Sequence, residues 1–241
     1  MIQTLYPTEA AAFRGGVREA LGVPAAVLGA GYIGFGSLAA EYGYSIGQII
    51  VATLAVWALP GQLIMIEMSA VGAPAVVIVA AVVMSAARFL PMTMTLMPML
   101  RGARYRPAAN YPAAQLASMT TWAVAVQRCP GLAAPSRLPY FVGFGVACLA
   151  VSAACGALGH LLTGMLPPLV RLGFVFLAPV YFFVILVGDV RTRLAAVALA
   201  GGALAGPLFH LVSPQWSVML AGFAGGTAAY FIQKAHGRRP A

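Results

Sequence analysis

Few side chains in this sequence can do chemistry, and the most notable of them lie inside long apolar stretches. Glu67 and Arg88 each sit well within such a stretch, and the run AVWALPGQLIMIEM carries Pro60, Gly61 and Gln62 near its middle. A charged side chain at the centre of a membrane helix costs roughly 2.5–3.5 kcal/mol on insertion scales, and a buried amide needs hydrogen-bond partners. We interpret these residues as a functional site, with a structural Glu67–Arg88 ion pair and a simple proline kink as the alternatives.

A proline inside a helix suggests the chemistry of such a site. It removes a backbone hydrogen bond at a cost of about 3 kcal/mol, and lipid offers no water to the freed groups. A discontinuous helix solves this problem: Pro60 becomes the first residue of a second half-helix, whose N–H groups attract an anion. The first half ends in carbonyls near Trp57 and Leu59, which attract a cation, so the break suits a zwitterionic amino acid. The predicted substrate-binding residues are Trp57, Pro60, Gly61, Gln62 and Arg88, and Glu67 is the candidate proton carrier.

An enzyme has little support in the sequence. The chain has no GxSxG, HExxH, CxxC or GxxxxGK motif, which are patterns typical of hydrolases, metalloproteases, redox proteins and nucleotide-binding proteins. Ser85, Ser152, His160 and His210 could in principle build an intramembrane hydrolase, but their spacing does not favour one. We therefore predict a protein that is not an enzyme, with no catalytic residue, no metal site and no cofactor.

Composition indicates which solvent surrounds the chain. Hydrophobic residues make up 61% of the 241 residues and charged residues only 8%, whereas a soluble domain has about 25% charged residues. The net charge of +9 comes from basic residues scattered between apolar blocks, which is typical of membrane-protein loops rather than of a nucleic-acid-binding surface. The sequence predicts an all-α, polytopic integral membrane protein with the lipid bilayer as a partner and no nucleic acid.

The apolar blocks are close to the length that a membrane-crossing helix requires. Residues 1–241 are predicted to form a single transmembrane transporter domain, with an interfacial amphipathic helix at 7–22, a basic loop at 101–112 and a basic cytoplasmic tail at 234–241. Candidate segments follow at 24–40, 47–70, 74–100, 113–127, 138–162, 167–187, 194–212 and 216–233.

The positive-inside rule then constrains the topology. Basic residues near both ends of the chain place the N- and C-termini in the cytoplasm. Eight full crossings would leave Arg101, Arg104 and Arg106 outside, whereas six spans keep them inside if 47–70 enters and leaves from the outer side and 113–127 from the inner side. We favour six full spans with two partial or re-entrant segments, and eight full spans is the alternative.

A possible two-fold internal repeat with discontinuous helices is suggested by two similarities. Gly34-Phe35-Gly36 recurs as Gly143-Phe144-Gly145, and the interruption at Pro60 has a counterpart at Pro179. Paired interruptions are common in transporters built from repeats. We predict helix-packing or gating roles for Gly34, Gly36 and Pro179.

The order of these features resembles the AzlC-type branched-chain amino-acid permeases, the large subunit of a two-component bacterial exporter. The resemblance covers nearly the whole chain through short motifs. These are Gly34-Phe35-Gly36, the element Ala58-Leu59-Pro60-Gly61-Gln62, the element Ala86-Ala87-Arg88-Phe89, and the run from Leu172 to Pro179.

Several positions depart from the family pattern. The Asn and His of the arginine element are Ala86 and Phe89 here, and the family's paired acidic residues appear as Thr120-Thr121. Arg88 and Gln62 are the strong polar residues that remain. The chain is thus similar to a divergent member of the family, with cargo and ion coupling left open.

The resemblance implies export of branched-chain or similar apolar amino acids across the bacterial inner membrane. It also implies a small hydrophobic AzlD-like membrane subunit as a partner. Proton coupling is a hypothesis motivated by Glu67 and by the lack of an ATP-binding motif. A channel-like facilitator and a noncatalytic membrane scaffold subunit are the alternatives.

Overall fold

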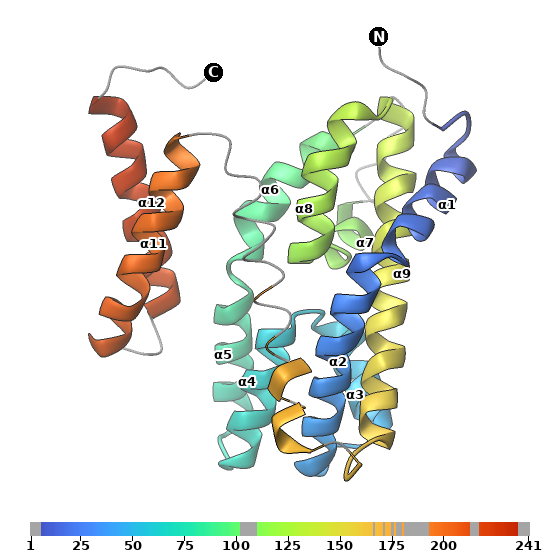
Figure 1. Cartoon of the computed structure of the whole chain (residues 1–241), viewed down its shortest axis with the longest axis vertical. Coiled ribbons are helices and arrows are strands. Elements are labelled where there is room, and N and C mark those ends of the chain that lie inside the picture. Colours follow the sequence, from blue (N-terminus) through green and yellow to red (C-terminus); the bar gives the residue numbers. More distant parts are fainter. Residues whose placement is uncertain are drawn as a thin grey trace. The chain divides into compact units, whose positions relative to one another are not determined.

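The computed structural model in Figure 1 describes residues 6–101, 110–165, 193–212 and 217–235, with scattered positions between 167 and 180. The described elements are helices, and no strand occurs among them, so the prediction of an all-α protein is confirmed. The chain divides into two compact units, Met1–Phe182 and Phe183–Ala241. Pro179 lies outside the described residues.

The first unit contains nine described helices, most of which fall on predicted segments. They are α1 (Glu9–Ala20), α2 (Val23–Glu41), α3 (Ile46–Ala55), α4 (Leu59–Ala70), α5 (Ala75–Ala86), α6 (Phe89–Leu100), α7 (Asn110–Gln115), α8 (Met119–Arg128) and α9 (Ala134–Leu161). In the second unit, α11 (Arg193–Val212) and α12 (Ser217–Ala235) pack against one another.

Two of the described helices, α2 and α9, are long and apolar enough to cross a membrane. The pair α5 and α6, bent by 49° at its junction, is a third if it forms one span. The helices α3 and α4 have 10 and 12 residues, so at about 1.5 Å per residue neither crosses about 30 Å of hydrocarbon alone. The number of full membrane spans, six or eight, remains a prediction.

Close glycine contacts join α1 and α2 to α9. A Cβ added at Gly16 of α1 would collide with the carbonyl oxygen of Tyr140, and one added at Gly36 of α2 would collide with that of Gly156. Gly34 is also buried in α2. Small residues let helix backbones approach closely where water does not drive association, so α1, α2 and α9 form the frame on which the shorter helices are held.

The helix predicted at 7–22 is α1, and it packs against α9. Its buried residues are Ala12, Gly16 and Ala20, which recur every fourth position along one face. The apolar residues from which the sequence predicted an interfacial helix lie on another face, where Phe13 is 38% and Leu21 61% exposed. The buried residues of α1 are its small ones, and Glu19 also reaches α9, where it accepts from the Tyr140 hydroxyl (2.7 Å).

The chain enters α3 and leaves α4 at the same end of the first unit. The Tyr44 hydroxyl, two residues before α3, donates to Ser69 Oγ near the end of α4 (2.8 Å). At the other end of the pair, Gln62 Nε2 donates to Thr53 Oγ1 (3.1 Å). Two helices joined at both ends in this way run antiparallel, so residues 46–70 form an antiparallel pair of short helices.

A second partial pair enters from the opposite end. There Arg137, near the start of α9, donates from Nη1 to Met99 O at the end of α6 (3.3 Å), and Arg128 at the end of α8 pairs with Glu19 of α1 (2.7 Å). The chain thus leaves α6 and returns from α8 at the same end. Arg101 lies at this end, which also carries α1. The six-span scheme, with partial segments at 47–70 and 113–127, remains a prediction.

Candidate functional site

The first helix interruption lies at residues 56–58, between α3 and α4. Val56 and Ala58 have non-helical backbone angles (ψ 72° and 99°), and Pro60 follows in the first turn of α4, where a missing N–H costs nothing. The sequence predicted Pro60 as the first residue of the second half-helix. The structure starts α4 one residue earlier, at Leu59.

The second interruption lies at Ala87 and Arg88, between α5 and α6. Pro91 causes it, because a proline has no N–H for the carbonyl four residues earlier and its ring collides with that carbonyl. The carbonyl belongs to Ala87, which instead accepts from Leu90 N (3.1 Å). Arg88 is therefore the residue that precedes the first turn of α6.

The third interruption lies at residues 116–118, between α7 and α8. Ser118 caps α8: its Oγ accepts from Thr121 N (3.3 Å), and Thr121 Oγ1 accepts from Ser118 N (2.7 Å). Thr121 Oγ1 also donates to Leu116 O (2.7 Å). This reciprocal capping box fixes where α8 starts.

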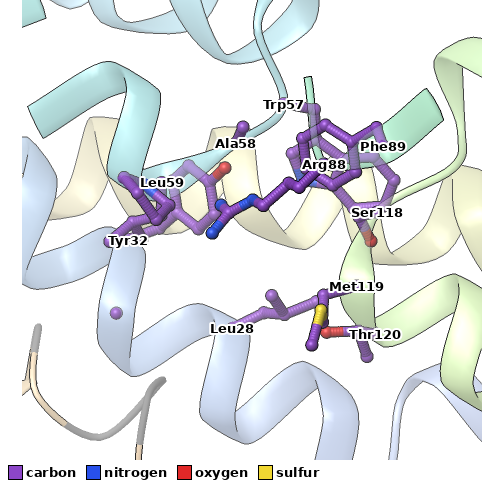
Figure 2. A pocket seen from close by; sticks show the side chains of 12 residues that line it. Leu28, Tyr32, Trp57, Ala58, Leu59, Arg88, Phe89, Ser118, Met119 and Thr120 are labelled. Atoms are coloured by element: carbon purple, nitrogen blue, oxygen red, sulfur yellow. The ribbon is translucent and has the colours of Figure 1, made fainter. Parts of the chain in front are cut away.

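The three interruptions line one pocket with the middle of α2 (Figure 2). Its cavity volume is about 50 Å³, and one side of it is open. Arg88 extends along one side, and Leu28, Met119 and Thr120 lie on the opposite side. The lining residues are Leu28, Gly31, Tyr32, Trp57, Ala58, Leu59, Pro60, Arg88, Phe89, Ser118, Met119 and Thr120.

Three of the predicted site residues thus lie together, and three do not. Trp57, Pro60 and Arg88 line the pocket. The Trp57 ring is held by a hydrogen bond from Nε1 to Ser152 Oγ of α9 (3.2 Å). Gly61 and Gln62 are buried in α4 without lining the pocket, and Glu67 is exposed further along the same helix.

Three carbonyls at the end of α3 accept hydrogen bonds from within the protein. Gln115 Nε2 of α7 donates to Leu54 O (2.7 Å) and to Ala55 O (3.3 Å). Val56 O accepts from Ala58 N (2.6 Å). Reasoning from one helix alone did not anticipate the contacts of Gln115, whose amide comes from the other partial pair. Cation binding at the carbonyls near Trp57 and Leu59 stays a prediction.

Electrostatically, the pocket favours negative charge. Arg88 is the charged residue among those lining it, and the first turns of α4, α6 and α8 each add the positive end of a helix dipole, equivalent to about +0.5 charge. Arg88 contacts the Phe89 ring, 5.3 Å from its centroid, and forms no ion pair with Glu67. Within the described residues, the ion pair found is Arg128–Glu19.

Sequence reasoning missed the contribution of α8 and α2 to this pocket. Ser118 looks like an ordinary polar residue of a short apolar segment, and Thr120 was noted only as a departure from the family's acidic pair. Tyr32 and Leu28 lie in a helix with no polar marker. The pattern Ser118-x-x-Thr121 could have located the start of α8. Nothing in the sequence brings that start next to Arg88.

Comparison with known proteins adds one positive finding. The family model described as AzlC protein matches residues 25–166, a range that includes the pocket-lining residues and runs from the third residue of α2 to beyond the end of α9. Neither the curated proteins nor the solved structures gave a match. Because the family match covers more than half of the chain, the protein belongs to the AzlC family.

Proposed function

We propose that this protein is a secondary transporter that exports branched-chain or similar apolar amino acids across the bacterial inner membrane. Membership of the AzlC family, which is a family of membrane transport proteins and not of enzymes, supports the general function. The apolar helices support a membrane location. The amino-acid cargo is the part that we propose from the resemblance and from the pocket.

The observation that carries the proposal is the meeting of three helix interruptions at one pocket. Substrate sites of many transporters lie where discontinuous helices leave backbone groups unpaired near the middle of the membrane. Here two partial pairs enter from opposite ends and meet at Gln115, which donates to the end of α3. A solute held between them has a route to either end when one pair moves.

The pocket walls match an apolar solute with one anionic group. Leu28, Trp57 and Leu59 offer hydrocarbon and aromatic surface, and Arg88 offers a guanidinium for a carboxylate. A bidentate guanidinium–carboxylate contact is among the stronger polar interactions in proteins. We assign Gly61 and Gln62 to holding the start of α4, because Gln62 Nε2 bonds Thr53 across the break.

Coupling and assembly belong to the same proposal. Glu67 is the candidate proton carrier, placed two turns along α4 from the pocket. A small AzlD-like subunit is the proposed protein partner. The N-terminus is proposed to be cytoplasmic because Arg14, Arg18 and Arg101 lie at the end of the first unit that carries α1. The C-terminus is proposed to be cytoplasmic because Lys234, Arg238 and Arg239 lie close to it in the sequence.

Counterflow in proteoliposomes tests the function. Vesicles loaded with unlabelled leucine should accumulate labelled leucine transiently when they contain the parent protein, reconstituted with its small partner if one is encoded nearby. Valine, isoleucine and methionine should compete. Arg88→Gln should abolish the signal, whereas the control Arg14→Gln, on the exposed face of α1, should retain it.

The outcomes separate the candidate functions. Labelled leucine that equilibrates without transient accumulation would indicate a channel-like facilitator. No flux of any tested amino acid through folded protein would refute the amino-acid carrier.

A further inference from the structure

The hydroxyl of Thr120 is a buried polar group without a partner. Thr120 is 1% exposed, lines the pocket, and its Oγ1 has no hydrogen-bond partner. Native proteins pair nearly all such groups, so an exception next to a cavity indicates a missing ligand. Thr121, its neighbour, has the opposite role, because its hydroxyl is fully used in capping α8.

Thr120 also lies in the first turn of a helix that points its free N–H groups at the pocket. Helix α8 has ten residues, and Ser118 Oγ satisfies only the N–H of Thr121. The N–H groups of Met119 and Thr120 have no acceptor among the described residues. A carboxylate accepts from such N–H groups and from a hydroxyl at once.

The pocket has no negatively charged side chain to bind a positive group. No carboxylate side chain is present among its lining residues. The carbonyls of Leu54, Ala55 and Val56, at the end of α3, accept from Gln115 Nε2 and Ala58 N. Glu67 lies eight residues after Leu59, which is about 12 Å along α4.

From this geometry we propose that the first turn of α8, through Thr120 Oγ1 and the N–H groups of Met119 and Thr120, binds the carboxylate of the cargo together with Arg88. This inference rests on the proposed function and sharpens its substrate class. Because the pocket complements an anion and not a zwitterion, it accepts branched-chain monocarboxylates that lack the amino group. Those anions bind at least as tightly as the corresponding amino acid, since they bring no unpaired ammonium into the pocket.

Three probes of matched shape test the substrate class. Leucine carries both charges, 4-methylpentanoate keeps only the carboxylate, and 3-methylbutylamine keeps only the ammonium. Their binding to the full-length protein in lipid nanodiscs is measured by isothermal titration calorimetry. We expect 4-methylpentanoate to bind with a Kd equal to or below that of leucine, and 3-methylbutylamine not to bind.

Other patterns overturn different statements. Binding of leucine without binding of 4-methylpentanoate would refute the anion inference and leave the proposed amino-acid carrier standing. Binding of 3-methylbutylamine as tight as that of 4-methylpentanoate would also refute it. Absence of binding by all three probes would refute the proposed function and this inference together.

Two substitutions test the place of the carboxylate. Thr120→Val keeps the shape of the side chain but removes the hydroxyl, and we expect it to weaken both leucine and 4-methylpentanoate about tenfold. Thr120→Ser restores a hydroxyl and should bind within about threefold of the parent. The control Thr93→Val, whose hydroxyl only donates to Leu90 O in α6, should leave binding unchanged.

The melting temperature without ligand separates binding from folding. Thr120→Val removes an unpaired polar atom, so its melting temperature should equal or exceed that of the parent. Unchanged affinity in Thr120→Val would refute the role of α8. Weaker binding accompanied by a lower melting temperature, with no rescue by Thr120→Ser, would identify Thr120 as a packing residue and refute it too.

Discussion

Gln115 connects the two partial helix pairs, and its replacement tests whether that connection holds the fold together. Its amide donates to Leu54 O at 2.7 Å and to Ala55 O at 3.3 Å. Gln115→Met keeps the length of the side chain and removes both donors. The shorter bond contributes about 1 kcal/mol and the longer one about half of that, so the free energy of unfolding should fall by about 1.5 kcal/mol.

The assay is unfolding in mixed micelles, with SDS as the denaturant and the parent as reference. Gln115→Glu is nearly isosteric, and its ionised carboxylate brings negative charge to the two carbonyls, so it should destabilise the protein more than Gln115→Met. Gln127→Met on the exposed part of α8 is the matched control and should change the free energy of unfolding by less than about 0.5 kcal/mol. A Gln115→Met variant as stable as the parent would refute the claim that this amide holds the end of α3.

Three further predictions concern the frame, the pocket wall and the coupling residue. Gly36→Ala forces a methyl group into a backbone carbonyl of α9 and should lower the free energy of unfolding by about 1–3 kcal/mol in the same assay. The control Gly202→Ala, with open space around the residue, should leave the free energy of unfolding unchanged or raise it. Trp57→Phe loses the bond to Ser152 Oγ and should weaken leucine binding severalfold in calorimetry, while a tighter complex would contradict this positioning role. Glu67→Gln should bind leucine like the parent, because Glu67 does not line the pocket. It should lose the accumulation of leucine that a pH gradient drives. An unchanged response to the gradient would exclude Glu67 as the proton carrier.

Much of the fold follows from local patterns in the sequence. Long apolar blocks predict α2 and α9, and Pro60 within an apolar block predicts a break close to where α3 ends. The basic residues after α6 favoured a partial segment over a full span for 47–70, and the contact of Tyr44 with Ser69 agrees with that arrangement. These features depend on hydrophobicity, charge and proline geometry, which act over short distances along the chain.

The composition of the pocket could not be predicted in the same way. Thr120 and Arg88 come together because three interruptions at 56–58, 87–88 and 116–118 meet, and that meeting depends on long-range packing. Arg88 was recognised because an arginine in an apolar stretch is costly anywhere. Thr120 carries no such penalty in sequence terms, and its importance is visible only when its hydroxyl is found buried without a partner.

The helix interruptions suggest a different pair of similar segments from the pair that the sequence suggested. The predicted correspondence paired Pro60 with Pro179, which lies outside the described residues. In the structure, the interruption at 56–58 before α4 resembles the interruption at 116–118 before α8, and in each case a turn then leads to a further helix, α5 or α9.

The central claim is that the pocket at the three helix interruptions is the cargo site, and site-directed labelling tests it most directly. Ala58 lines the pocket between α3 and α4, so Ala58→Cys, in a background with Cys129, Cys148 and Cys155 replaced, places a thiol there. The rate of its reaction with a small water-soluble maleimide is measured in membranes, with and without leucine. We predict that the thiol reacts and that saturating leucine slows the reaction at least tenfold. A reactive thiol that leucine does not protect would contradict the account and move the cargo site elsewhere.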